Sequence, residues 1–191
     1  MDRKHLVTVI FLLGTLFLSA CVTPLHPVPP GTTHLESSTH GLVFGRIAIT
    51  GNVCLQMSQS CGMDFGWWMK REDSGEYFVV NKLTKDGPFA LSLPAGTYRV
   101  SAIMFRDCGG VMWHGKLPAT FTVNAGEAVY LGTWTIRFLA DGLTARTHVV
   151  DNFTEERQEL AKTYIGPPLP MAAALLKSAP EGYFAGEERR D

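Results

Sequence analysis

Hydrophobic and polar residues alternate in short runs between Gly41 and about Asp151, and glycine, proline, asparagine and aspartate separate the runs. Alternation of this kind places one face of a strand in a core and the other face outside it. The runs are rich in Val, Ile, Thr and aromatic residues, which favour strands. The predicted strands are Leu42–Thr50, Phe65–Lys70, Tyr77–Asn81, Phe89–Leu93, Thr97–Phe105, Val111–His114, Thr120–Val123, Ala128–Phe138 and Leu143–Val150.

Two three-residue segments that end in glycine, Pro94–Gly96 and Asn124–Gly126, each separate two alternating runs. Such a segment suits a type I turn closed by a residue in the left-handed conformation, which commonly joins the two strands of a hairpin. The sequence therefore predicts two hairpins, one around each segment.

The pattern changes after the last predicted strand. Asp151 and Asn152 can cap a helix over Phe153–Tyr164, and we expect its apolar face to pack on the strands. A further short helix is expected over Met171–Lys177, followed by a mobile tail over Pro180–Asp191.

The N-terminus carries basic residues followed by an apolar run over Leu6–Ala20. As a helix with ~1.5 Å rise per residue, this run would cover only ~22 Å of a ~30 Å hydrocarbon core. A short apolar run with a positive flank is typical of a secretory signal rather than a membrane span.

The end of this run, Leu18-Ser19-Ala20-Cys21, resembles the lipobox of bacterial lipoproteins. The resemblance implies cleavage before Cys21 and acylation of that cysteine. Several acyl chains, at ~0.8 kcal/mol per buried CH₂, would make the membrane anchor stable. Val22 stands where an aspartate would favour the inner membrane, so the resemblance implies an outer-membrane anchor with the folded part facing the periplasm. The alternative is an ordinary signal peptide whose cleavage site happens to precede a cysteine.

Residues 22–40 combine four prolines with many serines and threonines and carry little apolar surface to bury. They are predicted to be a flexible tether that could span about 60 Å when fully extended. We therefore expect a signal peptide over residues 1–20, the acylated cysteine and tether over 21–40, a β-domain over 41–151, and a helix with a tail over 152–191.

The segment Phe89–Ala102 contains an apolar strand, a Pro/x-Gly turn and a Tyr-x-Val strand. It resembles the signature of prealbumin-like, carboxypeptidase-regulatory-like β-sandwiches. Val43–Ile49 resembles the opening strand of those domains, and Val123–Gly132 resembles their closing hairpin. The resemblance implies a mainly β fold, an antiparallel sandwich of seven or eight strands followed here by a short C-terminal helix, used as a binding or spacer module.

Composition and motifs exclude several kinds of function. A formal net charge of -1, from 17 basic and 18 acidic side chains, argues against nucleic-acid binding, which needs a basic surface. The six histidines lack the short spacing of metal ligands. The sequence also lacks a phosphate-binding loop, a serine nucleophile motif and a paired-carboxylate motif. We therefore expect no metal, no cofactor and no catalytic residue.

If Cys21 is acylated, three cysteines remain: Cys54, Cys61 and Cys108. In an oxidising compartment, one pair forms a disulfide and one thiol is left over. Cys54–Cys61 is favoured because the two are close in sequence, although Cys108 could pair with either. Cys108 could also act as a nucleophile with His114, but it lies in a glycine-rich turn rather than at a helix N-terminus.

The aromatic residues provide the candidate contacts with a partner. Trp67 and Trp68 are adjacent, so on a strand they face opposite sides of the sheet. One can lie in the core, and the other is either covered by a loop or the C-terminal helix or open to a partner. Trp113 is the third candidate, because exposed tryptophans anchor protein interfaces and stack on sugars.

The resulting hypothesis is a non-enzymatic binding or assembly module whose partner is another envelope protein. A module that contacts carbohydrate or peptidoglycan is the alternative, and a hydrolase is the third hypothesis.

Overall fold

A computed structural model describes residues 22–32, 38–51, 65–84, 86–106, 112–163 and 169–187. The described chain is mainly β with one helix, which confirms the predicted class. Its elements are β1 (Val22–Leu25), β2 (His40–Gly51), β3 (Phe65–Arg71), β4 (Tyr77–Leu83), β5 (Asp86–Pro94), β6 (Gly96–Arg106), β7 (Met112–Lys116), β8 (Ala119–Val123), β9 (Ala128–Phe138), β10 (Thr144–Val150), α2 (Phe153–Thr163), β11 (Met171–Ala173), β12 (Lys177–Ser178) and β13 (Glu181–Glu187).

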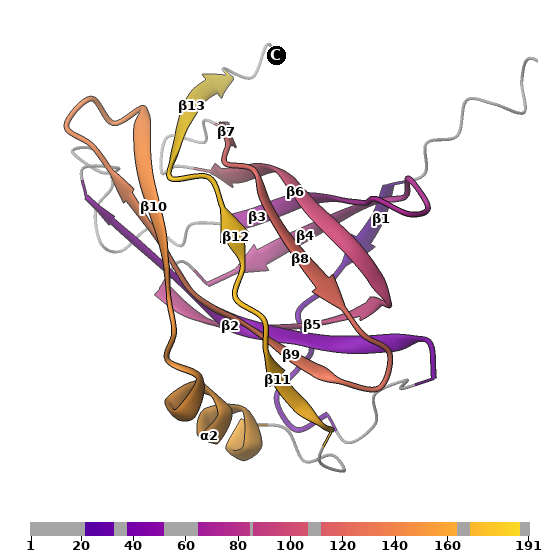
Figure 1. The fold of residues 1–191 in the computed structure, drawn as a ribbon. Coiled ribbons are helices and arrows are strands. Elements are labelled where there is room, and N and C mark those ends of the chain that lie inside the picture. The colour runs from indigo at the N-terminus through magenta and orange to yellow at the C-terminus, as the bar shows by residue number, and fades with distance from the viewer. Residues whose placement is uncertain are drawn as a thin grey trace, which may run out of the picture.

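Within the described residues, thirteen strands form one mixed sheet in the order β1-β4-β3-β6-β7-β13-β10-β9-β2-β5, with β8, β11 and β12 off this path. The sheet curls into a nearly closed barrel (Figure 1). The pairs β1·β4, β2·β9 and β9·β11 are parallel. The prediction of an antiparallel sandwich with seven or eight strands is therefore wrong in strand number, strand direction and overall shape.

Both predicted turns exist, but neither forms a hairpin. Strand β5 pairs with β2, whereas β6 pairs with β3, β7 and β8. Likewise β8 pairs with β6 and β12, whereas β9 pairs with β2, β10 and β11. The physical reason is that both turns bond to the chain entering β2: Ala95 N–H donates to Thr39 O over 2.9 Å, and Gly126 N–H donates to His40 O over 2.9 Å. Gly126 has the expected left-handed φ, +73°.

The C-terminal segment, residues 169–187, runs between two halves of the barrel, β9 and β10 on one side and β7 and β8 on the other (Figure 1). Strand β11 lies parallel to β9, β12 pairs with β8, and β13 lies between β10 and β7. Leu176 and Phe184 point into the core and are buried. The predicted helix over Met171–Lys177 is therefore wrong, and residues 181–187 of the predicted mobile tail form a strand.

Residues 22–32 form what we call the N-terminal strap. Strand β1 pairs with β4, Val28 N–H donates to Ala90 O over 2.8 Å, and Gly31 N–H donates to Thr163 O over 2.8 Å. Val28 is buried. These residues were predicted to be a flexible tether, and for them the prediction is wrong because backbone hydrogen bonds, rather than a large apolar area, hold them to the barrel. Residues 33–37 of the predicted tether lie outside the described residues.

Helix α2 confirms the predicted helix, and Tyr164 lies outside the described residues. Asp151 Oδ1 accepts a hydrogen bond of 3.0 Å from the backbone N–H of Phe153 at the start of the helix. The helix packs outside the barrel on β2 and β9, where Leu160 and Phe153 meet Phe44 and Tyr130. This packing forms a second apolar cluster, separate from the barrel core.

Candidate functional site

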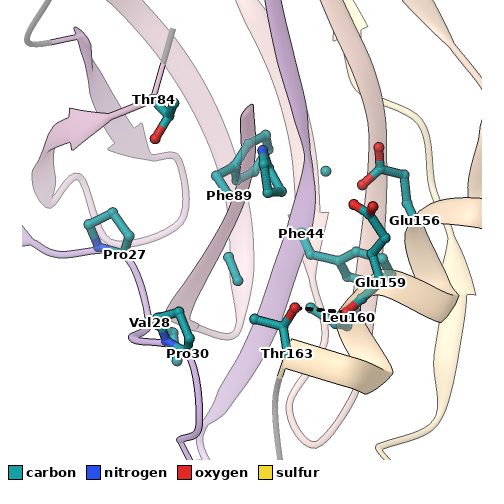
Figure 2. Close-up of a pocket in the computed structure, with 13 residues that line it drawn as sticks. Pro27, Val28, Pro30, Phe44, Thr84, Phe89, Glu156, Glu159, Leu160 and Thr163 are labelled. Carbon is teal, nitrogen blue, oxygen red and sulfur yellow. Dashed lines mark hydrogen bonds between the residues drawn. The ribbon is translucent and has the colours of Figure 1, made fainter. Parts of the chain in front are cut away.

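A groove lies on the outside of the barrel between the N-terminal strap and helix α2 (Figure 2). We call it the strap–helix groove, and its volume is about 240 Å³. Its floor is formed by β2 and β5, and its walls come from two segments that lie more than 100 residues apart in the sequence. It is lined by Pro27, Val28, Pro30, Phe44, Gly45, Thr84, Pro88, Phe89, Ala90, Glu156, Glu159, Leu160 and Thr163.

The apolar floor of the groove follows from the alternation of side chains along β2. Phe44 and Arg46 lie two residues apart, so both side chains lie on the outer face of the sheet. The register shift between them comes from an extra residue in β9, where their partners are Tyr130 and Thr133. Between the two residues of β2, Gly45 lets the backbone of β2 lie close to that of β9, because a Cβ at this position would lie 2.5 Å from the carbonyl oxygen of Gly132. Phe44 and Ala90 thus present an apolar surface to Leu160 of α2.

One side of the groove carries charge. Arg46 Nε donates to Glu156 Oε1 over 2.7 Å, and Arg46 Nη2 donates to Glu159 Oε2 over 2.9 Å. The side chain of Glu156 is only 8% exposed, against 31% for Arg46 and 58% for Glu159. The hydrogen bond that Arg46 donates to Glu156 is the main cause that raises the pKa of Arg46 above its ordinary value, and desolvation of the guanidinium opposes this rise. Two carboxylates face one guanidinium, so this wall keeps an excess of one negative charge.

The size and chemistry of the groove limit what it can hold. Pockets for drug-sized ligands measure ~300–1,000 Å³, so about 240 Å³ suits one or two side chains better than a whole small molecule. The hydroxyl of Thr163 is already used, because it donates to the carbonyl oxygen of Glu159 over 2.8 Å. Among the described residues, no group of three His, Cys, Asp or Glu side chains could hold a metal ion.

The three candidate tryptophans differ in how deeply they are buried. Trp67 is fully buried in the barrel core, where its ring meets Phe89 and Trp134 edge-on at 4.9 and 5.7 Å between centroids. A partner therefore cannot reach Trp67, and its place among the candidate contacts is wrong.

Trp68 and Trp113 remain candidates. Trp68 is half-buried on the outer face of β3, and its indole N–H donates to Met104 Sδ over 2.6 Å. Trp113 is also half-buried, and it stacks on Phe105 with 6.1 Å between ring centroids. The alternative in which the C-terminal helix covers the second tryptophan is wrong, because α2 packs on Phe44 and Tyr130 instead.

The cysteine predictions are not addressed by the structure. Cys21, Cys54, Cys61 and Cys108 all lie outside the described residues. Acylation of Cys21 and the Cys54–Cys61 disulfide therefore stay predictions.

The sequence reasoning missed the strap–helix groove, although one signal was available. Phe153, Glu156 and Leu160 lie on one face of α2, so Glu156 is an acidic residue on the face that packs against the barrel. Arg46 likewise interrupts the apolar run Val43–Ile49. An isolated acid and an isolated base, each inside a buried pattern, indicate a partly buried pair.

Comparison of the chain with protein families, with curated proteins and with solved structures gave no match. The described residues include no helix of the length and hydrophobicity needed to cross a membrane. The fold and the groove therefore define the chain as a mainly β protein with a nearly closed mixed barrel and a small amphipathic surface groove.

Proposed function

We propose that the chain is a bacterial envelope lipoprotein, anchored in the outer membrane through Cys21, whose barrel is a non-enzymatic binding module facing the periplasm. The observation that carries the binding role is the strap–helix groove, with its apolar floor and its acidic wall. The sequence Leu18-Ser19-Ala20-Cys21 supports the anchor.

The chemistry of the groove favours a segment of another envelope protein as its occupant. Pro30 and Pro88, which line the groove and are exposed, offer contact to an apolar side chain above the buried Phe44. Glu159, which is mostly exposed, offers its carboxylate to a neighbouring lysine or arginine. The occupant is thus a protein segment in which an apolar residue lies next to a basic one.

Cross-linking in cells tests the groove. A photoreactive amino acid in place of the exposed Thr84, which lines the groove, is expected to capture one partner protein, whereas the same amino acid at Ala140 is not. Glu159→Gln is expected to weaken capture about two- to five-fold, because an exposed ion pair contributes ~0.5–1 kcal/mol. Glu155→Gln is the matched control on the same helix, outside the groove, and should leave capture unchanged. Equal capture in the two Gln variants would contradict the role of the groove.

A second experiment tests the anchor. Cys21→Ser is expected to remove the acyl mass from the mature N-terminus and to move the protein from the membrane fraction to the soluble fraction, because the serine hydroxyl cannot take the place of the thiol. Thr23→Ser, two residues away, serves as the control and should keep both properties. Mass spectrometry and fractionation measure the result, and a Cys21→Ser protein that stays in the membrane with unchanged mass refutes the lipid anchor.

Carbohydrate or peptidoglycan contact through Trp68 and Trp113 is the alternative proposal, supported by the half-exposed position of both rings. The two proposals differ in a measurable way. If the rings carry binding, Trp68→Ala lowers affinity for the glycan, and Glu159→Gln has no effect on it.

A further inference from the structure

One end of the barrel is a layer of turns, which we call the turn end: residues 38–40, 72–76, 94–97 and 124–127. These segments are distant in sequence but bonded to one another. Their backbone hydrogen bonds are Ala95 N–H to Thr39 O at 2.9 Å, Gly126 N–H to His40 O at 2.9 Å, and Glu72 N–H to Thr97 O at 2.8 Å. The layer is therefore continuous across this end of the molecule.

Strand β1 begins at the turn end. Val22 pairs with Tyr77, the residue that follows the 72–76 turn, and β1 then runs away from that end in parallel with β4 (Figure 1). Consecutive Cα atoms lie ~3.8 Å apart, so a group attached to Cys21 is within about one residue of the barrel. The predicted tether would have allowed about 60 Å between them.

We propose that the acyl chains on Cys21 hold the turn end of the barrel directly against the lipid bilayer, with no flexible tether between them. The inference rests on the proposed function, because it requires an acylated Cys21. The surface that meets the turn end is then the headgroup layer of the membrane that holds the anchor.

The side chains beside the anchor point suit that environment. Val22 is exposed and apolar, so it can enter the boundary of the acyl layer next to the lipid. Tyr77 is half-buried, with Lys70 Nζ 5.6 Å from the centroid of its ring. Tyrosine rings are enriched at the level of the lipid headgroups. A lysine side chain can lay its apolar stem along an apolar surface and keep its ammonium group in water.

The charges around the 72–76 turn are balanced, whereas Glu127 adds one further carboxylate in the 124–127 turn. Three ion pairs join the basic and acidic side chains around the 72–76 turn: Arg71–Asp73 at 2.8 Å, Arg71–Glu76 at 3.4 Å and Arg99–Glu72 at 2.7 Å. Together with Lys70, three basic side chains face three acidic ones. Anionic headgroups attract basic segments and repel acidic ones, so a balanced turn can approach them closely without a net repulsion.

The test compares the two ends of the barrel in the acylated full-length protein. A fluorescent amino acid replaces Ser74 at the turn end or, in a second variant, Ala140 in the β9–β10 turn. Strand β9 connects the two ends, and at ~3.3 Å per residue its length is roughly 30 Å or more. The protein is reconstituted into vesicles of phosphatidylethanolamine and phosphatidylglycerol that carry a nitroxide quencher on some headgroups. Emission at Ser74 is expected to be mostly lost, and emission at Ala140 to be retained.

A matched variant restores a tether. A Gly/Ser insertion of about 16 residues between Cys21 and Val22 has an r.m.s. length of roughly 20 Å, and it is expected to keep acylation while restoring the emission at Ser74. Equal quenching at Ser74 and Ala140, or quenching at Ser74 that survives the insertion, overturns the inference while the proposed function stands. A membrane-bound protein whose Cys21 carries no acyl group overturns the proposed function, and the inference with it.

Discussion

Replacing Phe184 with alanine is expected to lower the free energy of unfolding by about 3–5 kcal/mol, the range for Phe→Ala in a packed core. Phe184 is 1% exposed and its ring lies 4.7 Å from that of Phe138 and 5.8 Å from that of Phe105, between centroids. Gly115 leaves the space for this ring, because a Cβ there would lie 2.0 Å from Phe184 Cε1. Urea denaturation followed by tryptophan fluorescence measures the change.

The adjacent residue provides the control for this prediction. Tyr183 lies on the opposite face of the same strand and is 58% exposed, so Tyr183→Ala is expected to cost at most about 1 kcal/mol. If the two variants unfold at the same urea concentration, β13 is not part of the barrel core, and the closure of the barrel by its C-terminal segment is refuted.

The second large effect concerns the ion pair beside the groove. Arg46→Met leaves the nearly buried carboxylate of Glu156 without its 2.7 Å partner. Removing one partner of a buried ion pair lowers the free energy of unfolding by ~3–5 kcal/mol. We expect a loss of about 3 kcal/mol here, because Arg46 is partly exposed to water. Thermal or urea unfolding of the purified protein measures the loss.

The double variant Arg46→Met/Glu156→Leu is expected to regain most of that stability, because removing both charges leaves an apolar contact in place of an unpaired carboxylate. Glu159→Gln, which removes only the exposed partner of Arg46, is expected to cost about 1 kcal/mol or less. A double variant as unstable as Arg46→Met would show that the loss comes from packing around Arg46 rather than from the charge left on Glu156.

The strands of the barrel were predictable, and their partners were not. Alternation is a local property, so the range Ala128–Phe138 and the start of α2 at Phe153 were predicted to the residue. Pairing depends on contacts that are distant in sequence. The segments Pro94–Gly96 and Asn124–Gly126 have the composition of hairpin turns, but their backbone groups bond to Thr39 and His40 at the entry to β2. This contact separates the strands on either side of each turn.

The errors at the two chain ends have a common cause. Met171–Lys177 contains alanine, leucine and lysine, which favour helices, and the strap contains prolines and little apolar area. In both segments the backbone completes pairs that neighbouring strands leave open, as in β11 on β9 and β1 on β4. Tertiary pairing of this kind overrides composition, and sequence patterns within a short window do not report it.

The adjacent tryptophans illustrate what a strand pattern can decide. Alternation required Trp67 and Trp68 to face opposite sides, and it left open which one was buried. The choice is made by Phe89 and Trp134, which come from two other strands and enclose Trp67. The position of the groove was beyond reach for the same reason, since its walls come from the strap and α2 and meet only in the folded chain. Only the charged pair beside it, Arg46 and Glu156, left a signal in the sequence.

The position of β11, β12 and β13 also sets the order in which the molecule can fold. Strands β7 and β10 share β13 as a neighbour, and β8 and β9 receive β12 and β11. Strands β11, β12 and β13 follow β7, β8, β9 and β10 in the chain, so a growing chain lacks these partners when the earlier strands have already been synthesised. Pairings of such long sequence separation form slowly. A growing chain therefore cannot complete the barrel before residues 169–187 are available to pair.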